Sequence, residues 1–403
     1  MMKKIVVVYF LIVCALPVFA FGAKQMRMID PFIRSSPRTD GMGGNHIAAV
    51  SGVDALLINP AALHISKSTT QFASLSIETI GPIFDIVGSA NILGAMGGIA
   101  QKAGGKIPLG INIQGPLSFA MVNPNNSPNL DRNDRRGLIP PGSAEVLDRN
   151  HNDYNGFGWG IFDYVSADIR ILGTTQVNVK IAMDFVIPFG MSARLADMPN
   201  YTVDFGFSVK ALTRLWYHNN DNPLSVFDIA DDNFDFGTYI SGLKSNVFIG
   251  GGFNLGFLYR LPAYGLSFAL TANDFAAGLS YLEENPAITQ YAIPVLNIGA
   301  AWQVPVFNFL DLTLMLTYYD FNNLFYNDYI TKNPILNLNA GIELKFWDTL
   351  FLRAGIQDML LSVGLGVEYG IFQFDAAFHG TELGNEPGSF TTYALDIGFS
   401  FRL

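Results

Sequence analysis

Cysteine, charge and long apolar runs are all scarce in this sequence of 403 residues. The single cysteine, Cys14, lies in an N-terminal apolar stretch, so the rest of the chain has no disulfide to form. Charged residues make up 14% of the chain, whereas roughly a quarter is usual in globular proteins. After the N-terminal stretch no run of about 18 apolar residues occurs, which argues against transmembrane helices. Because 50% of the residues are hydrophobic, the chain is either a very apolar soluble protein or a membrane β-barrel, and the barrel fits better.

Motifs for catalysis and for cofactors are missing as well. The sequence has no GxSxG nucleophile elbow. The glycines at 41–44 do not follow a strand, as those of a nucleotide-binding loop would. The five histidines lack the close pairing of a helix-borne zinc site: His46, His64, His151, His218 and His379. We therefore expect no enzymatic activity, no cofactor and no metal.

Residues 1–23 have the composition of a secretory signal peptide. Lys3 and Lys4 form its charged beginning, residues 5–19 form its apolar core, and cleavage is expected after Ala20 or Ala23. Removing the two lysines takes the formal charge from −10 to −12. An acidic, exported chain is not expected to bind nucleic acid, whose phosphates need a basic surface.

Period-two alternation of apolar and polar residues, the signal of a β-strand, runs through most of the chain after residue 70. In 175–187 the odd positions are apolar and most even positions are polar. In 335–346, Leu338 and Ile342 alternate with Asn339 and Glu343 in the same way. A soluble β-sandwich alternates too, with its apolar face inward, so the period alone does not separate the two architectures.

Strand length and number favour the membrane barrel. The segments run about 10–15 residues, whereas globular strands average about 5–6 and membrane-spanning barrel strands need about 9–11. An antiparallel barrel of about fourteen strands over 71–403 is predicted, an even number as in closed bacterial barrels. The predicted strands are 71–80, 111–122, 154–168, 175–189, 201–217, 246–259, 264–275, 291–304, 309–321, 334–346, 349–357, 361–369, 371–379 and 390–402.

Stretches around 81–110, 123–153 and 218–245 interrupt the strands and are expected to be extracellular loops. The chain ends on the aromatic-rich strand Phe399–Leu403, which looks like the C-terminal signal that the barrel-assembly machinery recognises. That machinery and the lipid of the bacterial outer membrane are therefore expected partners.

Residues 24–70 are expected to form a helical hatch that fills the bore of the barrel. Asp40 is expected to cap a helix start, because a carboxylate there accepts hydrogen bonds from free backbone N–H groups. Small and apolar residues favour a compact helix over 46–58. Asn59-Pro60 is expected to end that helix, since the residue before a proline avoids helical angles.

Three short motifs in this stretch together resemble the N-terminal hatch of the FadL-like outer-membrane proteins: Gly-Met-Gly-Gly at 41–44, Val-Asp-Ala at 53–55 and Asn-Pro-Ala-Ala-Leu at 59–63. FadL-like proteins are channels for long-chain fatty acids and other hydrophobic compounds. The pattern is also similar to PorV-like and spirochaetal relatives. The resemblance implies a hatch or gate that includes Gly41, Gly43, Gly44, Asp54, Asn59, Pro60 and Ala61. For Asn59 the alternative is structural: its amide satisfies backbone groups at the end of the helix.

The resemblance also implies a lateral opening in the third strand. By order, that strand contains a glycine-rich run in which a kink or bulge is expected: Gly156, Phe157, Gly158, Trp159 and Gly160. The alternative is that these glycines allow close packing against the hatch.

Four cations face the lumen by alternation and are candidate partners for the carboxylate of a ligand: Lys180, Lys210, Arg214 and Lys345. Ion pairing with Asp184, Asp204 and Glu343 is the alternative, because buried charges are usually paired.

We therefore expect a monomeric outer-membrane channel for the passive uptake of hydrophobic small molecules such as long-chain fatty acids. A PorV-like barrel that docks secreted cargo without transporting anything is the main alternative. A host-facing surface protein that acts through its loops is a second alternative, and a soluble β-sandwich is a third.

Overall fold

A computed structural model describes residues 35–66, 69–81, 106–125, 155–172, 176–219, 224–225, 235, 238–239, 242–281, 289–291, 294–307, 309–321, 332–382, 384–389 and 391–403. The predicted signal peptide, 1–23, lies outside these residues. Within the described part of the chain, no helix is long and apolar enough to cross a membrane.

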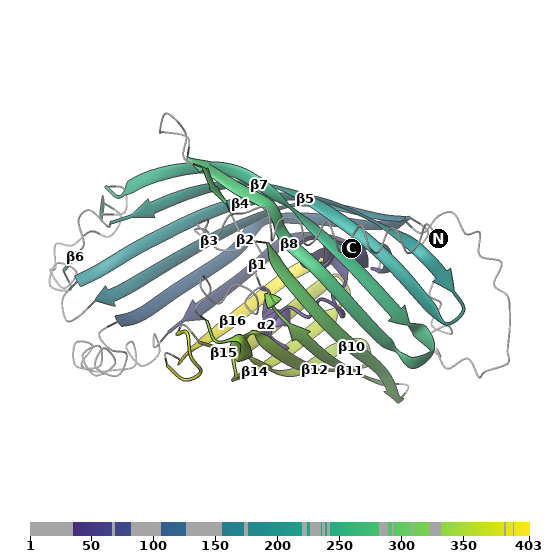
Figure 1. Cartoon of the computed structure of the whole chain (residues 1–403). Coiled ribbons are helices and arrows are strands. Elements are labelled where there is room, and N and C mark those ends of the chain that lie inside the picture. The colour runs from purple at the N-terminus through teal and green to yellow at the C-terminus, as the bar shows by residue number, and fades with distance from the viewer. Residues whose placement is uncertain are drawn as a thin grey trace.

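The described residues form sixteen strands, and fourteen of them close into one antiparallel barrel (Figure 1). Each barrel strand pairs with its neighbours in sequence, and β1 pairs with β16 to close the ring. The barrel strands are β1 (Thr69–Ile80), β2 (Lys106–Asn125), β3 (Asn155–Leu172), β4 (Gln176–Met198), β5 (Tyr201–His218), β7 (Lys244–Leu261), β8 (Leu266–Tyr281), β10 (Val295–Phe307), β11 (Leu310–Tyr318), β12 (Leu338–Phe346), β13 (Leu350–Gln357), β14 (Leu360–Tyr369), β15 (Phe372–Glu382) and β16 (Thr391–Arg402).

The predicted fold class is confirmed, since each of the fourteen predicted segments overlaps one barrel strand. Two short strands are not predicted: β6 (Leu224–Ser225) pairs with β4, and β9 (Thr289–Tyr291) pairs with β8. Two short 3-10 helices, η3 (Pro262–Tyr264) and η5 (Pro334–Asn337), lie next to β8 and β12.

The distribution of polarity identifies the barrel as a membrane protein. Ile342 and Ile397 on the outer face are 43% and 42% exposed, whereas Glu343 and Asp396, on the inner face of the same strands, are 8% and 3% exposed. A soluble sandwich buries its apolar face, so this arrangement is its inverse. A closed ladder leaves no backbone edge unpaired in lipid. The protein is therefore an outer-membrane barrel with an outward apolar band.

The wall differs in height around the ring. β4 has 23 residues and β13 has 8, whereas a membrane crossing needs about 9–11. The first part of β4 therefore extends beyond the bilayer. There Val177, Val179 and Ile181, which alternation assigns to the same apolar face as Ile187, are buried against residues such as Tyr217 and Leu224. Further along β4, Ile187 is 50% exposed, as alternation predicts.

Strand direction limits which loops share a side of the membrane. β1 and β2 are antiparallel, so Ile80 and Lys106 lie at one end of the barrel, and Asn125 lies at the other end with Asn155. The connections 82–105 and 126–154 lie outside the described residues, but they leave from opposite ends. The predicted loops 81–110 and 123–153 therefore cannot both be extracellular. The third predicted loop, 218–245, leaves from the same end as 82–105.

Candidate functional site: a segment inside the barrel

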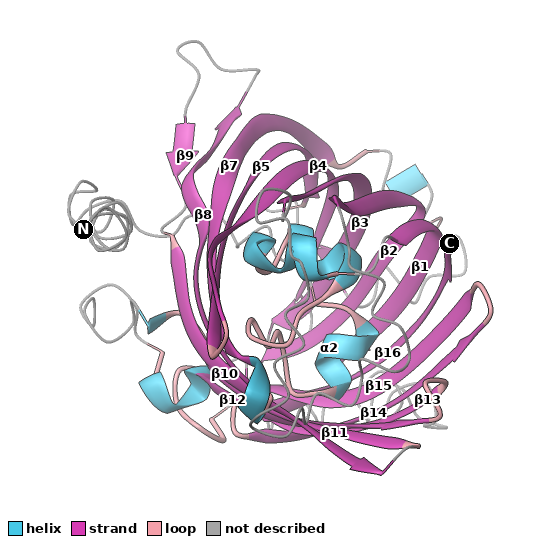
Figure 2. Cartoon of the chain, turned by 90° about the vertical axis from the view of Figure 1, so that its right-hand side faces the viewer, coloured by secondary structure: helices cyan, strands magenta, loops and turns pink. Residues whose placement is uncertain are grey.

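Residues 35–66, here called the luminal segment, lie inside the ring of strands (Figure 2). The segment contains α2 (Pro37–Gly41) and two 3-10 helices, η1 (Gly52–Leu56) and η2 (Pro60–Ile65). Most of its residues are buried against the inner faces of the strands. Of the predicted hatch, residues 24–34, 67 and 68 lie outside the described residues. That the segment acts as a hatch stays a prediction.

The internal structure of the segment differs from the predicted one. Ser36, and not Asp40, caps α2, because its hydroxyl and the Thr39 side chain bond reciprocally to each other's backbone N–H groups. The predicted helix over 46–58 is replaced by turns and by η1. Asn59 starts a helix where an end was predicted, since Pro60 occupies the first helical position of η2.

Asn59 is fully buried and its amide satisfies backbone groups on both sides. Its Oδ1 accepts a hydrogen bond from the Ala61 N–H at 3.1 Å, and its Nδ2 donates to the Ile47 carbonyl at 2.9 Å. This geometry supplies the structural role that the sequence left as an alternative. Asn59 therefore joins the first half of the luminal segment to the second.

Glycines allow the segment to lie directly against the wall. A β-carbon on Gly41 would come within 2.8 Å of the Gly364 Cα, and one on Gly43 within 2.6 Å of the Ile356 N. Gly43 also has a φ of +81°, which side chains with a β-carbon rarely adopt. Gly44 lies against the Asn339 side chain in the same way. The Gly-Met-Gly-Gly motif is thus explained by close packing against β12, β13 and β14.

The glycine-rich run of β3 has the same explanation. A β-carbon on Gly156 would meet the His64 backbone at 2.6 Å, and one on Gly158 would meet the Leu56 side chain at 3.0 Å. Residues 155–159 pair without interruption with β2 and β4, and Phe157 and Trp159 occupy regular positions in that ladder. Gly160 and Ile161 do not pair with residues of β4, so the ladder between β3 and β4 is interrupted at the last residue of the run without a change of register. Close packing accounts for Gly156 and Gly158, and a lateral opening at 156–160 stays a prediction.

The wall is also irregular one strand earlier. The register of β2 against β3 shifts between Gln114 and Phe119, and that of β1 against β2 shifts around Ser74. Gly115 has a φ of +88°, and Ala73, which has a β-carbon, has a φ of 47°. Bulges of this kind bend a strand and remove ladder pairing locally. Sequence reasoning missed this position, although Gly115-Pro116 is a glycine-proline break inside a predicted strand.

Apolar side chains line the lumen on one side of the segment. Leu56 and Leu63 pack against buried residues on the inner faces of β2 to β8: Ala120, Val122, Phe162, Tyr164, Val186, Leu212, Phe248, Ala277 and Leu279. Trp216 and Tyr281 extend this surface. The same strands also carry buried charged side chains such as Asp184, Lys210 and Arg214, so this apolar surface is a patch within a mixed lining.

Polar side chains of the wall hold the backbone of the segment. The Ser208 hydroxyl donates to the Leu56 carbonyl at 2.9 Å, the Asn254 amide donates to the Leu57 carbonyl at 3.1 Å, and the Asn273 amide donates to the Ile58 carbonyl at 3.3 Å. These bonds satisfy carbonyls that would otherwise be buried without partners. They fix the segment in one position against β5, β7 and β8.

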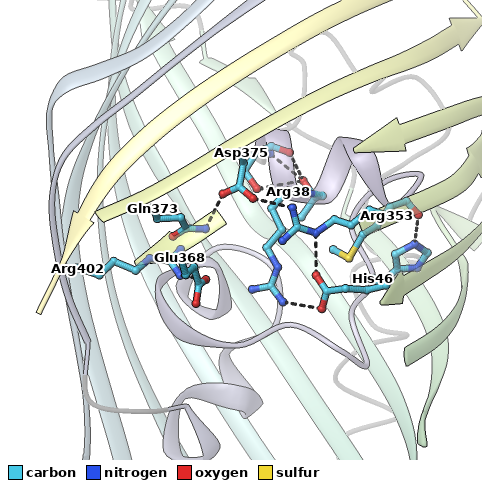
Figure 3. A network of polar contacts seen from close by, with 11 residues as sticks. Arg38, His46, Arg353, Glu368, Gln373, Asp375 and Arg402 are labelled. Carbon is cyan, nitrogen blue, oxygen red and sulfur yellow. Dashed lines mark hydrogen bonds and ion pairs between the residues drawn. The ribbon is translucent and has the colours of Figure 1, made fainter. Parts of the chain in front are cut away.

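On the opposite side a network of ion pairs joins α2 to the wall (Figure 3). Arg353 donates from Nε to Glu343 Oε2 at 2.8 Å and from Nη1 to Asp375 Oδ1 at 2.6 Å. Arg38 Nη2 of α2 lies 3.5 Å from Glu343 Oε1, and the Coulombic attraction of Glu343 raises the pKa of Arg38 above its usual value. Gln373 donates to Asp375 at 2.6 Å. Sequence reasoning missed Arg38 and Arg353, although Arg353 occupies an inward position of its predicted strand.

Of the four cations predicted to bind a ligand carboxylate, two are buried in ion pairs of the wall. Lys210 pairs with Asp274, and Arg214 binds both oxygens of Asp184 at 2.7 Å. Lys345 pairs with Asp348 at the turn between β12 and β13. Lys180 lies near the opposite end of the barrel, where β4 pairs with the end of β5. The structure does not bring these four residues together.

A cavity of about 60 Å³ lies between the luminal segment and strands β1, β2, β3, β15 and β16. Arg38, Asp54 and Arg402 line it, together with Ser74 and Gln114 of the irregular wall. Asp54 of the predicted gate is thus at the cavity, as are two guanidinium groups that no prediction includes. Ligand pockets usually measure about 300–1,000 Å³, so this cavity is too small for a long acyl chain.

Buried His46 should make the seating of the segment sensitive to acid. Its Nε2 lies 2.9 Å from the Met42 carbonyl and its Nδ1 lies 3.2 Å from the Thr317 hydroxyl. Burial lowers the pKa of His46 to about 4, although Met42 and Glu343 act in the opposite direction. Between about pH 6.5 and 4, His46 therefore binds a proton when the luminal segment is detached from the wall, but not when the segment is packed against the wall as in the structure. Seating should weaken by up to about 3 kcal/mol as the pH falls through that range.

A nitroxide spin label at exposed Ser51 should measure this effect as increasing mobility in the electron paramagnetic resonance spectrum. Burial raises the pKa of Asp40 to about 6, which acts in the opposite sense, so the contribution of His46 is the difference between wild type and His46→Gln. The variant should show less mobilisation on acidification. Identical pH profiles for the two proteins would contradict the prediction.

No protein-family model and no curated protein matches the chain. Among solved structures it is similar to the toluene transporter TbuX of Ralstonia pickettii, at 14% identity and a TM-score of 0.46, over 91% of this chain and 97% of that one. It is also similar to the toluene transporter TodX of Pseudomonas putida, at 13% identity and a TM-score of 0.46, over 92% and 98%. A FadL homologue of Pseudomonas aeruginosa shows 10% identity and a TM-score of 0.44, over 93% and 99%. At these identities and TM-scores the likeness concerns the barrel fold alone.

Proposed function

We propose that the protein is an outer-membrane channel for the passive uptake of hydrophobic molecules such as long-chain fatty acids, with the luminal segment as its gate. The observation that carries the proposal is the apolar surface inside the barrel, where Phe162, Leu212 and Phe248 face Leu56 and Leu63 of the segment. Apolar side chains offer water no hydrogen bonds. A hydrophobic molecule would gain about 25 cal/mol for each Å² of apolar area that it buries there.

In this proposal the small cavity belongs to the closed state of the channel. The cavity of about 60 Å³ touches the segment on one side and the irregular part of β1 and β2 on the other. Movement of the segment away from the wall would enlarge the cavity into a path along the apolar surface. Release sideways would take place where β1 and β2 lose register, since ladder bonds are already missing there.

Arg38 and Arg402 are the residues that would hold a ligand carboxylate. Both line the cavity, and within the described part of the chain the Nε of each has no hydrogen-bond partner. Arg402 Nη1 lies 3.5 Å from Glu368 Oε1, which leaves the other nitrogens of the guanidinium group for a ligand. Guanidinium groups bind carboxylates in a bidentate manner, so the pair suits a fatty acid better than a neutral hydrocarbon.

Binding of radiolabelled oleate to the full chain in detergent tests the proposal. Saturable binding is expected, altered when residues 40–63 are deleted and weakened about tenfold in Arg402→Gln. Lys345→Gln is the matched control, because Lys345 pairs with Asp348 away from the cavity and its loss should leave affinity unchanged. Heat-modifiable gel mobility verifies that the deleted form is still a barrel.

The small cavity also favours a second candidate, a PorV-like barrel that docks secreted cargo or a translocon and transports nothing. A scaffold needs a filled bore, and the luminal segment lies inside this one with most of its residues buried against the wall. The absence of oleate binding in both wild type and the deletion form would overturn the uptake proposal and support the scaffold.

A further inference from the structure

Four titratable side chains from four separate elements meet where α2 touches the wall. They are Asp40 of α2, Glu78 of β1, His379 of β15 and Asp396 of β16. His379 Nε2 lies 3.2 Å from Glu78 Oε1 and 3.9 Å from Asp40 Oδ2. Ligand atoms of Asp40, Glu78 and His379 all lie within 4.8 Å of one another. This group, here called the α2 cluster, is separate from the network around Arg353.

The α2 cluster contains buried polar atoms without partners. Asp40 is 1% exposed, and neither of its carboxylate oxygens has a donor in strict hydrogen-bond geometry among the described residues, although the side chains of Ser35 and Asp396 lie close enough to interact with it. His379 is 3% exposed; its Nε2 forms an ion pair with Glu78 Oε1 at 3.2 Å, and its Nδ1 has no hydrogen-bond partner among the described residues. Buried polar groups without partners are rare in folded proteins, and a site for an ion or a ligand is one of their usual causes.

The charges of the α2 cluster are also unbalanced. Glu78 and Asp396 are directly opposite in the ladder between β1 and β16, an arrangement that is unfavourable for like charges. Asp40 adds a third carboxylate, and His379 is the only base of the group. Two other buried acids of the lumen have arginine partners, since Asp204 pairs with Arg194 and Arg260, and Asp184 pairs with Arg214. In the described ranges, no lysine or arginine forms an ion pair with Asp40 or Asp396.

We propose that Asp40, Glu78 and His379 bind a divalent transition-metal ion such as Zn²⁺, which fastens α2 to the wall. Zn²⁺ binds imidazole nitrogen and carboxylate oxygen at about 2.0–2.2 Å, which places ligand atoms about 3.3–3.5 Å apart in a tetrahedral site. The separations of 3.2 and 3.9 Å bracket that value. Asp396 lies beside the site as a fourth ligand or as an acceptor for bound water.

A second observation supports the assignment of Glu78 as a ligand. Asn112 of β2 donates to Glu78 Oε2 at 2.6 Å, so one oxygen is fixed while Oε1 points to His379. Metal-binding carboxylates usually have such an outer-shell partner, which orients the free oxygen. Glu78 is also the half-buried member of the group, which gives an ion a route of entry.

Isothermal titration of Zn²⁺ into the full chain, purified without a histidine tag and stripped with a chelator, tests the proposal. One ion per chain is expected. Asp40→Asn and His379→Gln should each lower the affinity at least about 100-fold, beyond the about 10–100-fold typical of losing an outer-shell partner. His46→Gln is the matched control: another buried luminal histidine, whose nitrogens already have partners, so that zinc affinity should be unchanged.

X-ray absorption at the zinc edge of the wild-type protein keeps the test independent of whether the variants fold. The expected spectrum has nitrogen and oxygen neighbours at about 2.0–2.2 Å with one imidazole. Failure of the wild type to bind stoichiometrically would overturn the proposal, and so would unchanged affinity in Asp40→Asn and His379→Gln or a shell without imidazole. The result does not depend on oleate binding, so the metal site and the channel can fail separately.

Discussion

Replacing Arg353 with methionine should lower the free energy of unfolding by about 3–5 kcal/mol, because it leaves two buried carboxylates without their shared partner. Arg353 has a 1% exposed side chain between Glu343 on β12 and Asp375 on β15. Methionine fills a similar volume but brings no charge. Arg38 would then be the only guanidinium within ion-pair distance of Glu343 in the described part of the chain.

Urea-induced unfolding in phospholipid vesicles measures the effect. Lys345→Met is the matched control, since Lys345 also sits in an ion pair but is 28% exposed, and surface pairs contribute about 0–1 kcal/mol. Replacing Glu343 with leucine together with Arg353→Met should restore part of the loss, because one uncompensated charge is then removed. A loss below 1 kcal/mol in Arg353→Met would show that water reaches the network and that the ion pairs do not hold α2.

The barrel was predictable because period-two alternation depends on each strand alone. Outward Ile342 and inward Glu343 follow the pattern wherever a strand crosses the bilayer, and all fourteen strands were found in this way. Alternation gives the wrong environment for Val177, Val179 and Ile181, because it places them on the lipid-facing side of the strand with Ile187. They lie beyond the bilayer and pack against other parts of the protein, and the sequence does not reveal which surface covers a strand.

The inside of the barrel was less predictable because its structure depends on contacts between distant segments. The carbonyls of residues 56–58 accept hydrogen bonds from Ser208, Asn254 and Asn273 of the wall, and helix propensity within the segment does not include those bonds. The α2 cluster is the extreme case. Its members come from four elements, so no spacing in the sequence shows them as a group, whereas the closed ring brings β1 next to β16.

A disulfide between Ile47→Cys and Gly299→Cys should abolish uptake of hydrophobic molecules if the luminal segment has to move. A β-carbon on Gly299 of β10 would lie 2.8 Å from Ile47 Cγ1, so a sulfur in place of that carbon is within reach of a disulfide. Cys14 is the only other cysteine of the sequence, and it lies in the predicted signal peptide. Oxidised cells should take up radiolabelled oleate at least about tenfold more slowly than the same cells treated with a reductant.

The reversible bond separates a moving gate from a fixed plug within one molecule. Any damage that the two substitutions do to packing is present in both redox states, so only the difference between the states reports on movement. Each single cysteine variant should be insensitive to oxidation. Equal uptake in the two states would mean that substrate passes while the segment stays attached at Ile47, and a lateral path through the irregular β1–β2 wall would then have to operate alone. If neither redox state takes up oleate although the wild type binds it, uptake would require a glycine at position 299. The missing side chain of Gly299 lets Ile47 reach the wall.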